Sequence, residues 1–157
     1  MDALDPTWPW RLTRRVLPQH TDHAGVMWHG AYLRWLEEAR VEALAAVGLP
    51  YRMLSDRGLE LPVVSLTIDY RRPLQHGDSV DIESMVGAAQ GLRLPWCSRF
   101  VGVGGHVAAT ARVELVLVES RPDPFGGAPQ RRLRRQPPAD LAEALAALRR
   151  GPLITMP

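Results

Sequence analysis

Residues 20–40 read HTDHAGVMWHGAYLRWLEEAR. The first ten of these residues are polar, rich in histidine and irregular. Residues 30–47, by contrast, contain no proline, and Gly48 and Pro50 after them are typical helix stop signals. Apolar residues recur there at helical spacing, as Tyr32, Leu36, Ala39, Ala43 and Val47, and the stripe is widened by Leu33 and Trp35. The pattern predicts a loop followed by a long helix over about Gly30 to Val47.

Strand patterns flank this helix. Apolar and polar residues alternate with period two after Pro62, and Pro95 indicates an edge strand or a bulge. Turn signals at residues 76–78, 87–91 and 104–105 separate the runs. The predicted strands cover residues 10–17, 62–70, 80–84, 92–103 and 106–119. This order predicts one strand, a long helix and then a meander of four strands.

The last part of the chain reads as a surface loop over residues 121–138, which carries the basic run Arg131, Arg132, Arg134 and Arg135. Residues 139–150 are rich in alanine and leucine, with an aspartate near the start and two arginines at the end, so they predict a short terminal helix. At 157 residues, the whole chain (1–157) has the size of a single domain.

The opening stretch resembles a known family signature. From Thr21 onward it is similar to the pattern T-D-x-x-G-V-x-x-H-x-x-Y-[LF]-x-[WF]-x-E-x-A-R of the 4-hydroxybenzoyl-CoA thioesterase family and its Tol-Pal-associated branch. The run IDYRRPL over residues 68–74, with Gly77 and Asp78 after it, resembles the strand and hairpin of that family. The resemblance covers about residues 10–120. It implies an α+β hotdog fold, an antiparallel sheet wrapped around a long central helix, and acyl-CoA thioesterase activity.

The chemistry of a thioesterase fits this segment. A thioester carbonyl needs a nucleophile or an activated water on one side and hydrogen-bond donors for the developing oxyanion on the other. Asp22 lies just before the helix, whose first N–H groups lack intrahelical partners and carry the positive end of the dipole. The resemblance makes Asp22 the catalytic carboxylate, as nucleophile or general base, and the backbone N–H of His29 the group that polarises the carbonyl. The His29 side chain is a second catalytic candidate, and the alternative role of Asp22 is that of a turn or cap residue.

Five residues are candidates for substrate binding. Gly25 allows a tight bend before the helix, and Trp28 and Tyr32 border the expected site, although a tryptophan here can equally belong to the core or an interface. Arg71 and Arg72 suit the phosphates of coenzyme A, as does the basic run in the tail. Solvated surface charge is the alternative explanation for these arginines.

Metal binding is the other chemistry considered for the histidines. His20, Asp22, His23 and His29 offer imidazole and carboxylate ligands, but their spacing matches no familiar zinc site, and the thioesterase signature accounts for them. We expect no metal and no cofactor.

Composition limits the other function classes. Nineteen basic residues, all arginine, against 17 acids leave a formal net charge of +2, which is too small to indicate a nucleic-acid partner. No stretch reaches the roughly 20 apolar residues of a membrane span, and the first residues lack the pattern of a secretory signal. With a lone cysteine, Cys97, we expect a cytoplasmic protein.

Assembly and the competing activities complete the sequence-based expectations. A curled sheet leaves strand edges open, so we expect a homodimer or homotetramer. The alternatives to a thioesterase are a hotdog hydratase or dehydratase, which would use Asp22 with His29, and a non-enzymatic acyl-CoA binding module. The acyl group is not specified by the sequence.

Overall fold

The computed structural model describes residues 4–153, so the outermost three and four residues of the predicted domain lie outside it. The described elements are, in chain order, β1 (Trp10–Arg15), the short 3-10 helix η1 (Pro18–His20), α1 (His29–Ala46), α2 (Tyr51–Asp56), β2 (Leu59–Glu60), β3 (Val63–Tyr70), β4 (Ser79–Val86), β5 (Leu94–Val101), β6 (Val107–Leu115), β7 (Val118–Arg121), β8 (Gln130–Leu133) and α3 (Ala139–Arg150).

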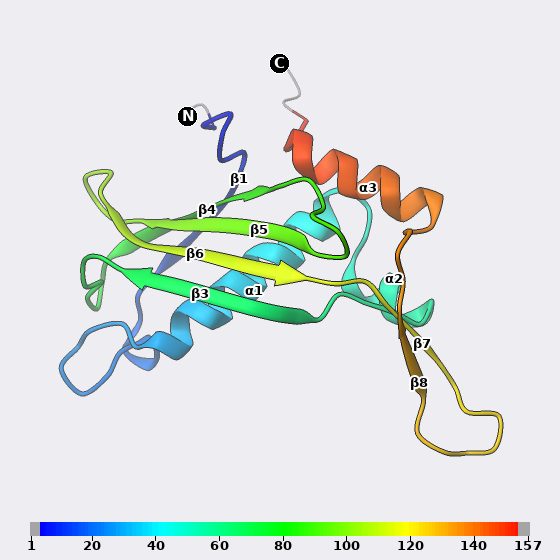
Figure 1. Cartoon of the computed structure of the whole chain (residues 1–157). Coiled ribbons are helices and arrows are strands. Elements are labelled where there is room, and N and C mark those ends of the chain that lie inside the picture. The colour runs from blue at the N-terminus through cyan, green and yellow to red at the C-terminus, as the bar shows by residue number, and fades with distance from the viewer. Residues whose placement is uncertain (1–3, 154–157) are drawn as a thin grey trace.

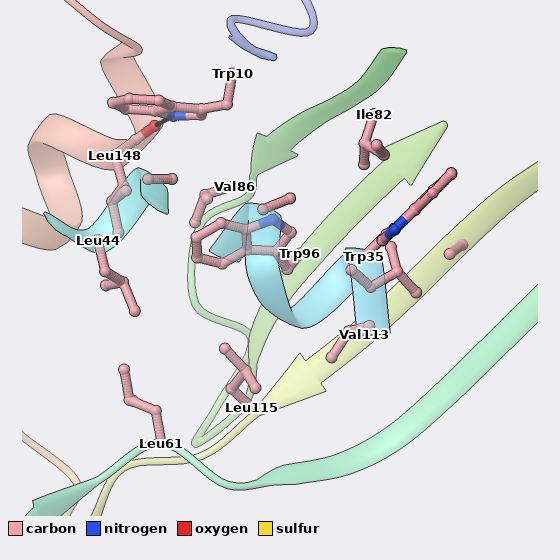
Figure 2. Packing of buried hydrophobic residues seen from close by; sticks show 14 of the residues in the cluster. Trp10, Trp35, Leu44, Leu61, Ile82, Val86, Trp96, Val113, Leu115 and Leu148 are labelled. Atoms are coloured by element: carbon pink, nitrogen blue, oxygen red, sulfur yellow. Dashed lines mark hydrogen bonds between the residues drawn. The ribbon is translucent and has the colours of Figure 1, made fainter. Parts of the chain in front are cut away.

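A five-stranded antiparallel sheet lies across the long helix α1 (Figure 1). The side chains between them form the core, which includes Trp35 of α1 and Trp96 and Val113 of the sheet (Figure 2). The predicted helix is confirmed to within one residue at each end, and the predicted fold class is confirmed as well. Leu33 is an exception, because it is exposed instead of widening the buried stripe.

The predicted meander of four strands is wrong in its first member. The sheet order is β1-β4-β5-β6-β3, so only β4, β5 and β6 form a meander, while β3 pairs with β6 at the far edge. The connection after β3 leads to β1, where Val16 donates to the carbonyl of Asp78 and accepts from the N–H of Gly77. Turn residues mark where a strand ends, but they do not specify the strand with which the next one pairs.

The prediction of one strand over residues 106–119 is also wrong, because the chain leaves the main sheet after Leu115. The Val116 N–H bonds the carbonyl of Pro62, and β7 joins a second sheet of order β2-β7-β8. The predicted loop 121–138 contains β8, in which Arg131 and Arg132 are strand residues. The sequence analysis did not predict α2 and β2.

Strand β3 forms an exposed edge. A register shift between Val63 and Ser65 makes Val64 a bulged residue, so Val63 rather than Val64 shares the inner face with Leu66, opposite the buried Leu115 and Val113. Several apolar side chains remain exposed along this edge, namely Val63, Val64, Leu66 and Tyr70. The edge is therefore long and apolar, which soluble proteins normally cover.

Pro95 does not mark an edge or a bulge. Strand β5 lies between β4 and β6, and its register shift occurs between Phe100 and Val101. Pro95 is tolerated because β4 has already ended beside it, and its carbonyl still accepts the N–H of Gly87.

The C-terminal helix α3 is confirmed at residues 139–150 and closes one end of the core. The indole Nε1 of Trp10 donates to the carbonyl of Leu148 over 2.7 Å, and Arg57 pairs with Asp140 at the start of the helix (Figure 2 shows the first contact). Within residues 4–153, no helix has the length and apolar character needed to cross a membrane.

Candidate active site

The loop that precedes α1 is built around Asp22. Its Oδ1 accepts the N–H groups of Ala24 and Val26 at 2.9 and 3.1 Å, and its own N–H bonds the carbonyl of Val26 at 2.8 Å. Gly25 lies between them with a φ of 76°, a left-handed conformation that favours glycine. Asp22 thus shapes the turn with one carboxylate oxygen, while Oδ2 has no hydrogen-bond partner among residues 4–153.

The loop is tied to its surroundings by backbone bonds. The N–H of Met27 bonds the carbonyl of Leu74 at 2.7 Å, and that of Trp28 bonds the carbonyl of His20 at 3.1 Å. The N–H of His76 bonds the carbonyl of Gly25 at 3.1 Å. The bonds to Leu74 and His76 fix the loop against the connection between β3 and β4, and the bond to His20 fixes it against η1.

The first turn of α1 keeps free donors. Trp28 is the N-cap residue, and no side chain caps the helix. In the part of the chain that the structure describes, the N–H groups of His29 and Gly30 have no hydrogen-bond partner. Asp22 is therefore a turn residue but not the cap of α1, and the positive end of the helix is available to an anion or a polarised carbonyl.

The indole of Trp28 folds over Gly30. A Cβ atom at position 30 would lie 2.1 Å from Cη2 of that indole, so only glycine leaves room for the ring in this place. The ring also meets His29 edge to face, with centroids 5.1 Å apart, and Trp28 stays 43% exposed. An aromatic wall thus stands beside the free N–H groups.

A cavity of about 320 Å³ lies next to this loop. Its lining residues are Val26, Tyr32, Tyr70, Arg71, Arg72 and Pro73. Val26 connects the cavity to Asp22, because its N–H is one of the two that Oδ1 accepts. The structure thus brings Tyr32, Arg71 and Arg72 together in one cavity, whereas the predicted site residues Asp22, Gly25, Trp28 and His29 are not among its lining residues.

The aromatic side of the cavity is formed by packed rings. Tyr32 packs edge to face against Tyr70 and Phe100, with ring centroids 5.0 and 4.9 Å away. Burial, with a smaller contribution from Tyr70, raises the pKa of Tyr32 to about 12. The Tyr32 phenol therefore stays protonated at neutral pH and can act as a hydrogen-bond donor but not as a base.

The two arginines that line the cavity are exposed. The backbone N–H groups of Arg71 and Arg72 both bond the carbonyl of Ala108, at 2.8 and 3.0 Å, which fixes the chain where β3 ends. Their side chains are exposed and make no ion pair with any residue in the range 4–153. Two unpaired guanidinium groups at the rim of a cavity can hold a phosphorylated ligand.

The remaining histidines of the segment have other surroundings. His20 accepts the N–H of Leu17 at its Nδ1 over 3.0 Å and packs edge to face against Trp35. Among residues 4–153, no three His, Cys, Asp or Glu side chains are grouped as metal ligands would be.

The sequence analysis did not select the cavity residues Tyr70 and Val26, although Tyr70 directly precedes Arg71 and lies on the inner face of its strand.

Comparison with known proteins places this geometry in a family. The model of the thioesterase-like superfamily matches residues 16–145. The chain belongs to this superfamily. A relative of the chain is named as an acyl-CoA thioester hydrolase, and the chain is a thioester hydrolase of the hotdog fold.

Three known proteins illustrate the similarity. The Synechocystis protein sll0410, named as an esterase, is 38% identical over 134 residues, which cover 85% of this chain and 78% of that protein. The acyl-CoA thioester hydrolase YbgC of Escherichia coli is 27% identical, over 67% of this chain and 78% of its own. The crystal structure of TT1821 from Thermus thermophilus superposes with a TM-score of 0.73 at 28% identity, over 88% of this chain and 98% of that one.

Proposed function

We propose that the protein hydrolyses acyl-CoA thioesters with Asp22 as the catalytic carboxylate. The arrangement of Asp22 carries this proposal, because Oδ1 is held by two amides of its own loop while Oδ2 is left without a partner among residues 4–153. A carboxylate oriented in this way keeps one oxygen available for a carbonyl carbon or for a water molecule.

The first turn of α1 supplies the complementary group. When the carbonyl carbon is attacked, its oxygen takes up negative charge, and the N–H groups of His29 and Gly30 are free to stabilise it at the positive end of the helix. Collapse of the tetrahedral intermediate then expels the thiolate of coenzyme A. The His29 imidazole, which is exposed, is proposed to orient a water or the leaving group.

Two routes are compatible with a carboxylate in this position. In one, Oδ2 attacks the thioester carbon, the C–S bond breaks, and water hydrolyses the resulting mixed anhydride. In the other, Oδ2 removes a proton from the attacking water. A single turnover in ¹⁸O-labelled water distinguishes them, since only the first route can leave the label on the peptide that contains Asp22.

The cavity beside the loop is proposed to receive coenzyme A at Arg71 and Arg72, with Trp28, Tyr32 and Tyr70 lining the path of the acyl part. Gly25 and the turn that it allows keep the approach to Asp22 open.

On the residue pattern from Thr21 to Arg40, we assign the chain to the 4-hydroxybenzoyl-CoA thioesterase family and its Tol-Pal-associated branch. A panel of short aliphatic, phenylacyl and naphthoyl-CoA thioesters, followed by release of free thiol, tests the activity and identifies the acyl group.

Replacing both rim arginines, Arg71→Gln/Arg72→Gln, is expected to raise KM for acyl-CoA roughly fivefold with little change in kcat. Each exposed charge pair contributes only a fraction of a kcal/mol to about 1 kcal/mol, and added salt screens it. The same variant should behave like the wild type toward the acyl-pantetheine analogue, which lacks the nucleotide phosphates. The pair Arg149→Gln/Arg150→Gln on α3 is the control, and equal KM values for acyl-CoA in both double variants would contradict phosphate binding at the cavity rim.

The exposed edge of β3 is proposed to pair with the same edge of a second copy, giving a homodimer or a dimer-based homotetramer. A two-fold contact buries the same apolar side chains from both copies and removes the open edge. The cavity lies at the end of that strand, since Tyr70, Arg71 and Arg72 line it, so pairing would place the site beside the interface.

Light scattering at micromolar concentration is expected to show species of at least twice the 17.5 kDa chain mass. Leu66→Asp should shift the population toward the monomer, because it places a charge on the edge that pairing would bury. Val103→Asp is the control, since Val103 is an exposed apolar residue in the turn between β5 and β6. A wild-type protein that scatters only as a 17.5 kDa species would exclude this assembly.

The rival hydratase would need Asp22 and His29 to act on the acyl chain together. No hydrogen bond joins these side chains among the contacts that the structure describes. Hydration of crotonyl-CoA, assayed beside thiol release, separates the two activities. The binding-module alternative predicts that the protein binds acyl-CoA without hydrolysing it. The proposed cytoplasmic location does not distinguish this alternative from a thioesterase.

A further inference from the structure

The hairpin formed by β7, β8 and their connection projects from the body of the molecule (Figure 1). Its tip, residues 124–129, reads PFGGAP and contains no charged residue. Phe125 is 94% exposed there, and all four residues of β8 are exposed. A large aromatic side chain displayed alone at the end of an arm serves no purpose in the packing of this chain.

The tip has a specified conformation. The carboxylate of Asp123 accepts the N–H of Phe125 at Oδ1 (3.0 Å) and that of Gly127 at Oδ2 (2.9 Å). The N–H of Gly126 bonds the Asp123 carbonyl at 3.1 Å. The carboxylate of Asp123 is thereby directed to its own loop, and Phe125 is presented without the entropy cost of ordering the loop upon binding.

Positive charge gathers directly behind this tip. Residues 121–135 hold five arginines and one aspartate, a formal charge of +4, whereas the rest of the chain, with 14 arginines and 16 acids, carries −2. The five are Arg121, Arg131, Arg132, Arg134 and Arg135. The net positive charge of the protein therefore resides on the hairpin and the residues that follow it.

Three of these five arginines have an acidic partner within the chain, and two do not. Arg121 and Arg134 approach Glu119 at 3.3 and 3.8 Å, and Arg131 approaches Glu60 at 3.6 Å, but these pairs lie at the surface, where such contacts contribute little. Arg132 and Arg135 have no ion-pair partner among residues 4–153. The hairpin thus offers guanidinium groups to an external anion.

We propose that this hairpin docks on an anionic phospholipid surface. An apolar, uncharged tip followed by a band of arginines matches the two layers of a membrane interface, in which Phe125 enters the acyl boundary while the guanidinium groups stay at the phosphates. The long arginine side chains can reach the headgroups as the tip enters. A nucleic acid would engage the arginines but would leave the uncharged tip without an apolar layer to bury it.

Co-sedimentation with vesicles tests this proposal on the full chain. We expect binding to vesicles of phosphatidylcholine mixed with phosphatidylglycerol and none to phosphatidylcholine alone. Phe125→Ser should weaken partitioning roughly tenfold, because it removes the buried aromatic ring. Arg131→Gln/Arg132→Gln should weaken it by roughly fivefold for each charge removed.

Matched variants elsewhere on the surface serve as controls. Val103→Ser removes an exposed apolar side chain from another turn, and Arg149→Gln/Arg150→Gln removes two charges from α3; both should partition like the wild type. Thiol release from a soluble acyl-CoA should be unchanged in Phe125→Ser, so loss of vesicle binding with intact turnover in this variant separates the tip from the active site.

Four results would overturn the proposal. The first is equal vesicle partitioning of Phe125→Ser and the wild type, and the second is binding of the protein to heparin or single-stranded DNA but not to anionic vesicles. The third is self-association that depends on Phe125, and the fourth is a raised KM for acyl-CoA in Arg131→Gln/Arg132→Gln without any vesicle binding by the wild type. The last result would assign the arginines to coenzyme A.

Discussion

Asp22→Asn is expected to lower turnover of the best acyl-CoA substrate by roughly a hundredfold or more, because an amide can neither attack the carbonyl carbon nor accept a proton at a useful rate. The loop should keep its shape, since the asparagine Oδ1 can accept the same two N–H groups, from Ala24 and Val26. The variant should fold and unfold like the wild type. Binding should persist as well, because the proposed oxyanion donors belong to the backbone.

A second aspartate offers a close control. Asp78 accepts the N–H of Gln75 at its Oδ2 over 2.8 Å, so it also shapes an exposed turn with its carboxylate. Asp78→Asn should retain turnover, which would show that the loss in Asp22→Asn is not a general consequence of neutralising a turn aspartate. A folded Asp22→Asn enzyme that hydrolyses its best substrate at close to the wild-type rate would refute the proposed mechanism.

The parts of the fold that follow from neighbouring residues could be predicted from the sequence. The helix α1 was found to within one residue because its apolar period and its stop signals are local, and α3 was found for the same reason. Strand pairing depends on contacts between distant residues, so the position of β3 beside β6 was missed. The bulge at Val64 was missed too, since one extra residue shifts which side chains face the core without changing the apparent alternation.

Strand β8 shows a different limit. Its residues Gln130–Leu133 are exposed and basic, and they lie among prolines and glycines, so the segment resembles a loop in composition. Its strand conformation comes from pairing with β7, which no local pattern reports. The sequence analysis therefore did not predict the hairpin of β7 and β8, although it identified the run of arginines in it.

The candidate site divides in the same way. The sequence analysis selected Asp22, Tyr32, Arg71 and Arg72; the last three line one cavity, and Asp22 is connected to it through the N–H of Val26. That Oδ1 of Asp22 accepts two N–H groups while Oδ2 accepts none among residues 4–153 could not be predicted, because it depends on the directions of the backbone N–H groups. The packing of Trp28 on Gly30 likewise depends on a side-chain rotamer, and a sequence gives only the two residue types.

The packing of the Trp28 indole on Gly30 predicts a large loss of activity in the variant Gly30→Ala. Glycine within a helix is normally less stable than alanine by about 0.5–1 kcal/mol, so this change should not lower the stability of an exposed helix. Here the new methyl group would lie within 2.1–2.6 Å of three indole carbons of Trp28, and the exposed indole has to leave its place. Displacing a wall of the site by more than an ångström is expected to lower kcat/KM tenfold to a hundredfold.

A double-variant cycle makes this expectation specific to the indole. In a Trp28→Ala background the methyl group meets no ring, so Gly30→Ala should have almost no further effect on kcat/KM, and the two changes should be strongly non-additive. The Hα resonances of Gly30 report the packing without reference to activity, because the ring current of Trp28 should shift them in the wild type and not in Trp28→Ala. If the ring-current shift is present but Gly30→Ala remains fully active, Trp28 packs as described and takes no part in substrate positioning. If Gly30→Ala is equally damaging with and without Trp28, the loss arises from the helix N-terminus itself, and the indole has no role in it.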